Sequence, residues 1–62
     1  MFFAIIRNPL DNAEYFTNDS EVYGRKVSNW GTVPKLFLDK KKAGKKAKEV
    51  GGQVIGLRPT AV

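Results

Sequence analysis

The 62-residue sequence contains neither cysteine nor histidine. Without cysteine the chain can form no disulfide and offers no thiolate to a metal ion. Without histidine it lacks the side chain that most often serves as a general base or as a ligand for transition metals. Because catalysis would depend on carboxylates, lysines, tyrosines and serines alone, we predict a protein that is not an enzyme and uses no cofactor or metal.

Long apolar runs and acidic clusters are missing as well. The apolar stretch MFFAII at the N-terminus ends at Arg7, which is too short for a signal-peptide core or a membrane span. We therefore expect a cytoplasmic protein that does not insert into membranes. The carboxylates are scattered along the chain, and none belongs to a group with the spacing of a calcium or magnesium site.

Positive charge is what the sequence has in excess. Eleven lysines and arginines against six aspartates and glutamates give a net charge of +5 at pH 7. Such a chain is attracted to anionic partners, which are nucleic acid, acidic protein surfaces and anionic lipid. Charge alone does not choose among these classes of partner.

Most of this charge lies in the segment DKKKAGKKAKEVGG, residues 39–52, which we predict to be a helix. Asp39 is a suitable N-cap, and the Gly-Gly pair at the other end can supply the left-handed stop. On a helical wheel Ala43 and Ala47 fall on one narrow apolar stripe, with lysines on the far side. We expect the two alanines to lie close against a sheet.

The rest of the chain predicts short extended segments separated by turns. We expect strands over residues 1–8, 13–17, 35–38 and 53–57, an irregular extended piece over 21–27, turns at 8–12 and 18–20, and a loop over 28–32. This β-β-β-α-β order predicts a single small α+β domain spanning residues 1–62. Its sheet would be antiparallel or mixed, with three to four strands and one helix packed on one face.

The N-terminal strand is apolar on both sides. Phe2, Ala4 and Ile6 alternate with Phe3 and Ile5. One helix covers only one face of a sheet, so we expect Phe3 and Ile5 to lack cover in the monomer. A domain of this size also buries a small share of its surface. Together these arguments favour a homodimer that buries one of the two faces.

Aromatic and basic residues are interleaved in the stretch YGRKVSNW. Its candidate partner-binding residues are Tyr23, Arg25, Lys26 and Trp30. This composition is typical of surfaces that bind proteins or stack on bases. For Trp30 the alternative is a core position, because a small domain needs its largest side chain in its interior. The same alternative applies to Tyr23.

Lysines on the outer side of the predicted helix are the second candidate site. Those on the far side of the wheel, which we expect to bind anions, are Lys41, Lys42, Lys45 and Lys48. The alternative is a solvated helix face, because lysine is a good helix former. The helix contains no arginine, asparagine or glutamine, so any contact in a nucleic-acid groove would be independent of base sequence.

The pieces MFFAII, EYF, Trp30, KLFL, AGKKAKEVGG and QVIGL, in this order, resemble the layout of many short bacteriophage proteins. The resemblance implies an accessory factor that binds and redirects a host enzyme, a defence complex or a nucleic-acid machine. Phage inhibitors that mimic DNA are acidic, whereas this chain is basic. We predict an interaction protein that modulates or inhibits a host protein with an acidic surface; the alternative is a small nucleic-acid-binding protein that uses the helix Lys40–Lys48.

Overall fold

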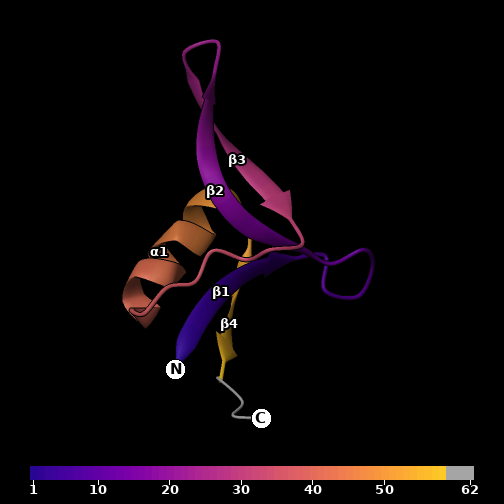
Figure 1. Cartoon of the computed structure of the whole chain (residues 1–62), viewed down its shortest axis with the longest axis vertical. Helices are drawn as coiled ribbons and strands as arrows, with labels where there is room; N and C mark the ends of the chain where they lie inside the picture. Colours follow the sequence, from indigo (N-terminus) through magenta and orange to yellow (C-terminus); the bar gives the residue numbers. More distant parts are fainter. Residues whose placement is uncertain (59–62) are drawn as a thin grey trace.

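The computed structural model describes residues 1–58; residues 59–62 of the predicted domain lie outside the described part. In chain order its elements are β1 (Phe2–Arg7), β2 (Glu14–Val22), β3 (Arg25–Gly31), α1 (Lys40–Val50) and β4 (Gln53–Leu57). The strands form one antiparallel sheet in the order β3-β2-β1-β4, with α1 against one face (Figure 1). The predicted α+β class is confirmed. The third strand of the observed β-β-β-α-β order is β3, however, and not the strand that we predicted over residues 35–38.

Helix α1 begins and ends at the residues that the sequence marks. The Asp39 carboxylate accepts a hydrogen bond of 2.8 Å from the backbone N–H of Lys41. Gly51 adopts a left-handed conformation (φ 79°), and its N–H donates to the carbonyl of Ala47. Ala43 and Ala47 are buried. The predicted caps and the predicted buried stripe are therefore confirmed.

The core lies between α1 and the sheet. Fully or almost fully buried residues at its centre are Ile5, Phe16 and Ala47, and around them pack Trp30, Phe37, Val50 and Val54. The rings of Phe16 and Trp30 meet edge to face, with 6.0 Å between their centroids. Trp30 thus takes the core position that the sequence allowed as an alternative.

The helix covers the side of β1 that carries Ile5, whose side chain is fully buried against Ala47. Strand pairing places on the opposite face, which no helix covers and which we name the open face, the residues Phe2, Ala4, Ile6, Ile55 and Leu57. Of these, Ala4 and Ile6 are buried, and the other three are partly exposed. The expectation that Phe3 and Ile5 would lack cover is wrong. Alternation shows which residues share a face, but it does not show which face the helix occupies.

The β2–β3 hairpin is longer than the sequence suggested. Strand β2 runs through residues 18–20, where we predicted a turn, and β3 includes residues 28–31, where we predicted a loop. The chain turns instead at Tyr23 and Gly24, both of which have the positive φ that type I′ hairpin turns require. Residues 18–20 favour turns by composition, but pairing with β3 decides their conformation.

Residues 35–38, predicted as a strand, make only an isolated bridge to β1. Phe37 and Phe3 exchange two backbone hydrogen bonds of 2.8 Å, and the N–H of Lys35 donates to the carbonyl of Phe16. Strand β1 pairs with β2 only through Ile6 and Arg7, because β2 then bends away. The segment that connects β3 to α1 therefore lies beside the first half of β1, in the position that β2 would occupy if it continued along β1.

The outer half of the hairpin projects from the body of the molecule (Figure 1). Because β1 pairs only with the beginning of β2, residues 18–29 form a two-stranded ribbon without a third strand. We refer to residues 18–29 as the arm. The described chain measures 43 × 26 × 20 Å, which is long for so small a domain.

Candidate functional site

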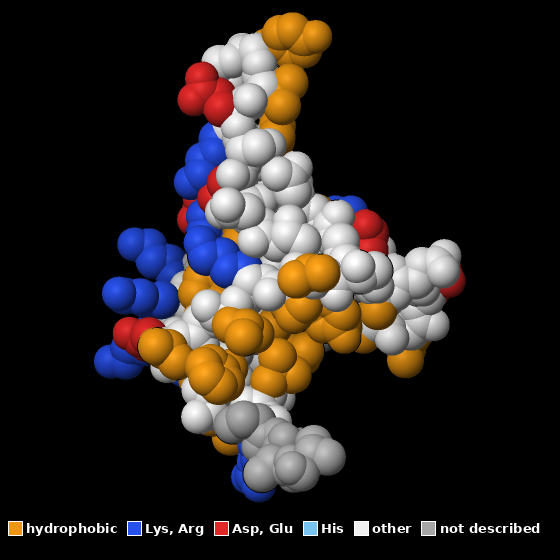
Figure 2. All heavy atoms as spheres, in the orientation of Figure 1, with side chains coloured by type: hydrophobic (Ala, Val, Ile, Leu, Met, Phe, Trp, Pro, Cys, Tyr) orange, Lys and Arg blue, Asp and Glu red, His pale blue; other side chains and the backbone are white. Residues whose placement is uncertain are grey.

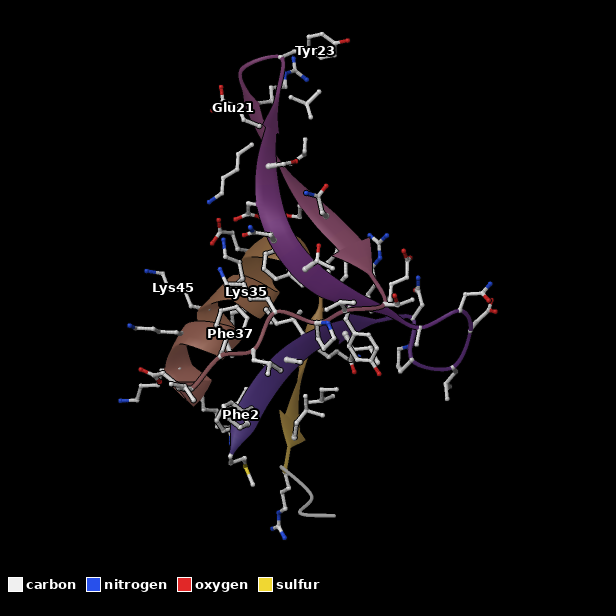
Figure 3. The ribbon with its side chains drawn as sticks, in the orientation of Figure 1. Phe2, Glu21, Tyr23, Lys35, Phe37 and Lys45 are labelled. Atoms are coloured by element: carbon white, nitrogen blue, oxygen red, sulfur yellow. The ribbon has the colours of Figure 1, made fainter. Side chains whose placement is uncertain are left out.

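Tyr23 stands at the tip of the arm. Its side chain is 100% exposed and points away from the body of the molecule (Figure 3). Its φ of 52° lies in the left-handed region, which costs a residue with a Cβ roughly 1–2 kcal/mol and is favoured by Gly, Asn and Asp. A fully exposed ring makes no contact that could offset this strain. The tip therefore carries a bulky side chain that the fold does not use.

The two sides of the arm differ: one carries Glu21 and Lys26, and the other carries Val22 and Val27 together with Arg25. Pairing of Glu21 with Lys26 places both on the side that faces α1, whereas Val22 and Val27 lie on the opposite side and are partly exposed. Figure 2 shows the apolar side chains along one edge of the arm and the charged ones along the other. An apolar strip therefore runs from Val27 through Val22 to the Tyr23 ring.

The sequence pointed to Tyr23 and Arg25 but missed the two valines of this strip. Arg25 pairs with Val22 and is exposed beside the tip. The valines were missed because the sequence did not show that the chain turns at Tyr23 and Gly24. Once Tyr23 and Gly24 are recognised as the turn, alternation puts Val22 and Val27 on one face of the ribbon.

A cluster of charges, which we name the clamp, ties the base of the arm to α1. Asp19 of β2 accepts hydrogen bonds from Lys46 Nζ at 2.7 Å and from Ser28 Oγ at 3.1 Å. Lys26 Nζ lies 3.1 Å from the same carboxylate and 3.8 Å from that of Glu49. A two-stranded ribbon is marginally stable alone, so these contacts help to hold the arm in place. Lys26, predicted to touch a partner, thus lies in the clamp.

The clamp changes the pKa values of its two central groups, the Asp19 carboxylate and the Lys46 ammonium group. The hydrogen bond from Lys46 is the main reason that the pKa of Asp19 falls from 3.8 to about 2. The same bond raises the pKa of Lys46 above its ordinary value. Both side chains are about four-fifths buried. The pair therefore stays ionised over the physiological range of pH.

Trp30 is covered from two directions. Phe16 packs against it on the core side, and the guanidinium of Arg7 lies 4.4 Å from the centroid of its ring. Arg7 is in turn held by Glu14, whose carboxylate accepts hydrogen bonds of 3.0 and 3.2 Å. Of the four predicted partner-binding residues, the structure brings Tyr23 and Arg25 together at the tip and places the other two in the clamp and the core.

The outer side of α1 presents a continuous group of exposed lysines, the lysine face, made up of Lys40, Lys41, Lys42, Lys45 and Lys48. Within residues 1–58 none of them forms a salt bridge. Figure 3 shows Lys45 pointing away from the sheet. The predicted anion-binding residues are thus brought together, and the structure adds Lys40.

No centre suited to metal chemistry is present in residues 1–58, where no three acidic side chains come together. An open hollow lies within the loop between β1 and β2 and is lined by Asn8, Pro9, Leu10, Asp11, Asn12 and Glu14. Leu10 in this loop is fully exposed. That the protein is not an enzyme stays a prediction.

Comparisons with protein-family models, with curated proteins and with solved structures find no significant match. In the part of the chain that the structure describes, no helix is long and apolar enough to cross a membrane.

Proposed function

We propose that this protein is a small, non-enzymatic binding protein that modulates a protein partner through the tip of its arm. The observation that carries the proposal is Tyr23, which is fully exposed and held at φ 52° at the most remote point of the hairpin. A tip selected for stability alone would carry Asn before Gly24, since Asn-Gly is the preferred pair for this turn. Strain that the fold does not need is often a sign of function.

The chemistry of the tip indicates the kind of surface it would bind. Tyrosine is a frequent anchor in protein interfaces because it buries a large rigid ring at a small entropic cost. The neighbouring Val22 and Val27 extend this ring into an apolar strip, and Arg25 adds a cation at its edge. The matching partner surface is an apolar pocket or groove with acidic residues at its rim.

A phage-type accessory role belongs to the same proposal. In that role the partner is a cytoplasmic host enzyme or a defence complex, and occupation of its pocket by the arm inhibits or redirects it. The shape of the chain supports this: a ribbon held at its base by the clamp can enter a groove that the helix-covered body cannot.

Self-association is a further part of the proposal. The open face of the sheet (Phe2, Ala4, Ile6, Ile55 and Leu57) carries no charged residue, and the lysine face lies on the other side of the molecule. Two copies can therefore meet through their open faces without bringing the lysines together. An interface of ordinary size, about 800 Å² per partner, would cover roughly a sixth of the 4973 Å² surface.

The test of the arm is a capture experiment with variants that separate binding from folding. Tagged wild-type protein, Tyr23→Asn and Leu10→Asn are incubated with a nuclease-treated bacterial lysate, and the retained proteins are identified. Leu10 is the matched control, because it too is a fully exposed apolar side chain at a loop. We expect the same partner with wild type and Leu10→Asn, and its loss with Tyr23→Asn.

Thermal unfolding of the same variants completes the test. Asn adopts positive φ more readily than Tyr, so Tyr23→Asn should be at least as stable as wild type while it binds more weakly. Truncating an aromatic anchor costs about 2 kcal/mol of binding, so Kd for the isolated partner should rise about 30-fold. Equal retention of the partner by Tyr23→Asn, or a marked loss of stability, would refute the proposed anchor.

A further inference from the structure

We propose that the lysine face of α1 is a second, separate binding surface, which contacts the phosphate backbone of nucleic acid without regard to base sequence. This surface is independent of the arm, and the proposal does not rest on the protein partner. It rests on the charge balance of the chain, on the surroundings of α1 and on the residue types that the helix exposes.

The net charge of the protein lies on this one surface. Removing the five lysines of the face from the eleven basic residues leaves six, which equals the number of acidic residues. Of the six other basic residues, three form salt bridges within residues 1–58: Arg7, Lys26 and Lys46. The whole excess of +5 is therefore concentrated on the outer side of a helix of 11 residues.

The arrangement is unfavourable for the helix itself. Lys40, Lys41 and Lys42 occupy the first turn, which contains no acidic residue, so they lie at the positive end of the helix dipole. Lys41 and Lys45 are four residues apart and repel each other. The Asp39 carboxylate at the N-cap offsets part of this positive charge, but it is a single carboxylate beside three lysines, and Glu49 reaches toward the clamp. A face that only kept the protein soluble would mix both signs of charge.

The exposed residue types favour phosphates over the other anionic partners. An amphipathic helix that binds membranes needs a free apolar side, but Ala43 and Ala47 are buried against the sheet. The face also lacks the aromatic and arginine anchors of protein interfaces. Lysine ammonium groups contact phosphate oxygens as point charges, and nothing on the helix can read base edges.

The spacing of the lysines suits a duplex. Lys41, Lys45 and Lys48 follow one another along the helix, and the first and last are about 10 Å apart at 1.5 Å per residue. Along B-DNA this distance corresponds to about three base pairs. Three to four phosphate contacts are therefore within reach of the face.

The experiment is a titration of a labelled 20-base-pair duplex of random sequence by fluorescence anisotropy, at several salt concentrations. For wild type we expect log Kd to change with log salt with a slope of magnitude about 3 to 4, since each contact contributes about 0.9. The double variant Lys45→Glu/Lys48→Glu should lose at least tenfold in affinity and about two units of slope. Tyr23→Asn should bind DNA as wild type does, which keeps this proposal separate from that of the arm.

The matched control removes the same charge from other places. Lys35→Glu/Arg58→Glu changes two exposed cations outside the face and should keep the wild-type salt slope. Circular dichroism shows whether charge reversal disturbs the helix. If it does, the pair Lys45→Gln/Lys48→Gln repeats the test without reversing the charge. Three results would each overturn the proposal. The first is an equal loss of DNA affinity with both Glu pairs, and the second is no DNA binding by the wild type at 50 mM salt. The third is binding to anionic lipid vesicles without binding to DNA.

Discussion

Gly52 offers the sharpest test of how α1 sits on the sheet. A Cβ at this position would lie 2.5 Å from Cγ2 of Ile5, 3.0 Å from Cη2 of Trp30 and 3.2 Å from the carbonyl oxygen of Ile6. Carbon atoms do not approach to 2.5 Å, and Ile5 is fully buried, so its methyl group has no free space to move into. Gly52→Ala must therefore shift the last turn of α1, β1 or the indole.

The expected cost follows from the effects of overpacking. Forcing an extra methyl into a packed core costs about 1–3 kcal/mol. A domain of this length has a total stability of only about 3–9 kcal/mol. At about 4–8 °C per kcal/mol for small domains, the midpoint of thermal unfolding should fall by about 4–24 °C.

Gly44→Ala is the control, because it adds the same methyl group within α1, whereas Gly52 lies just after the helix end. Nothing lies within 4 Å of the Cβ that this substitution creates, and alanine is favoured over glycine in a helix by about 1 kcal/mol. Circular dichroism during heating, together with urea titration, should show Gly44→Ala above wild type and Gly52→Ala below it. A Gly52→Ala protein as stable as wild type would mean that the end of α1 does not pack on β1 as described.

Two further predictions concern the clamp and the open face. The pKa of Asp19 is lowered from 3.8 to about 2 in the folded protein, so the stability that its carboxylate contributes is complete above a pH of about 4 and is lost as the pH falls toward 2. Between these pH values the unfolding temperature of the wild type should therefore fall more steeply than that of Asp19→Asn. Parallel curves for the two proteins would contradict the clamp. Sedimentation at micromolar concentration should give a mass of twice 6.9 kDa for wild type and about 6.9 kDa for Ile55→Glu on the open face. A wild-type mass near 6.9 kDa would exclude the homodimer.

The helix could be predicted from the sequence because its signals are local. The cap at Asp39, the stop at Gly51 and the buried stripe of Ala43 and Ala47 all lie within one segment, and each works through neighbours at most four residues away. Strands β1 and β4 were also found, since both are short apolar runs bounded by turn residues.

The hairpin could not be predicted in the same way, because distant pairing decides it. Residues 18–20 have the composition of a turn, and Tyr23-Gly24 lacks the Asn-Gly signature of the turn that actually forms. Pairing of Asp19 with Ser28, nine residues along the chain, outweighs the local preference. The sequence contains both strands but does not show their register.

The candidate site was only partly foreseen for a related reason. Tyr23 and Arg25 were predicted because interleaved aromatic and basic residues are typical of surfaces that bind proteins or stack on bases. Lys26 and Trp30 belong to the same stretch, yet the register turns one toward Asp19 and the other toward Phe16. Composition identifies a segment with binding character, but strand pairing decides which of its side chains remain free.

Each of the two proposed surfaces contains a local feature that is unfavourable for the fold. Within residues 1–58 every buried polar side-chain atom has a hydrogen-bond partner, and both ends of α1 are capped. Natural sequences tend to agree with their fold at every level. Yet Tyr23 occupies a left-handed position that Asn would fill better, and lysines occupy the first turn of α1, where carboxylates would be favourable. Both departures lower stability and both point into solvent, and contact with other molecules, as we propose, would account for them together.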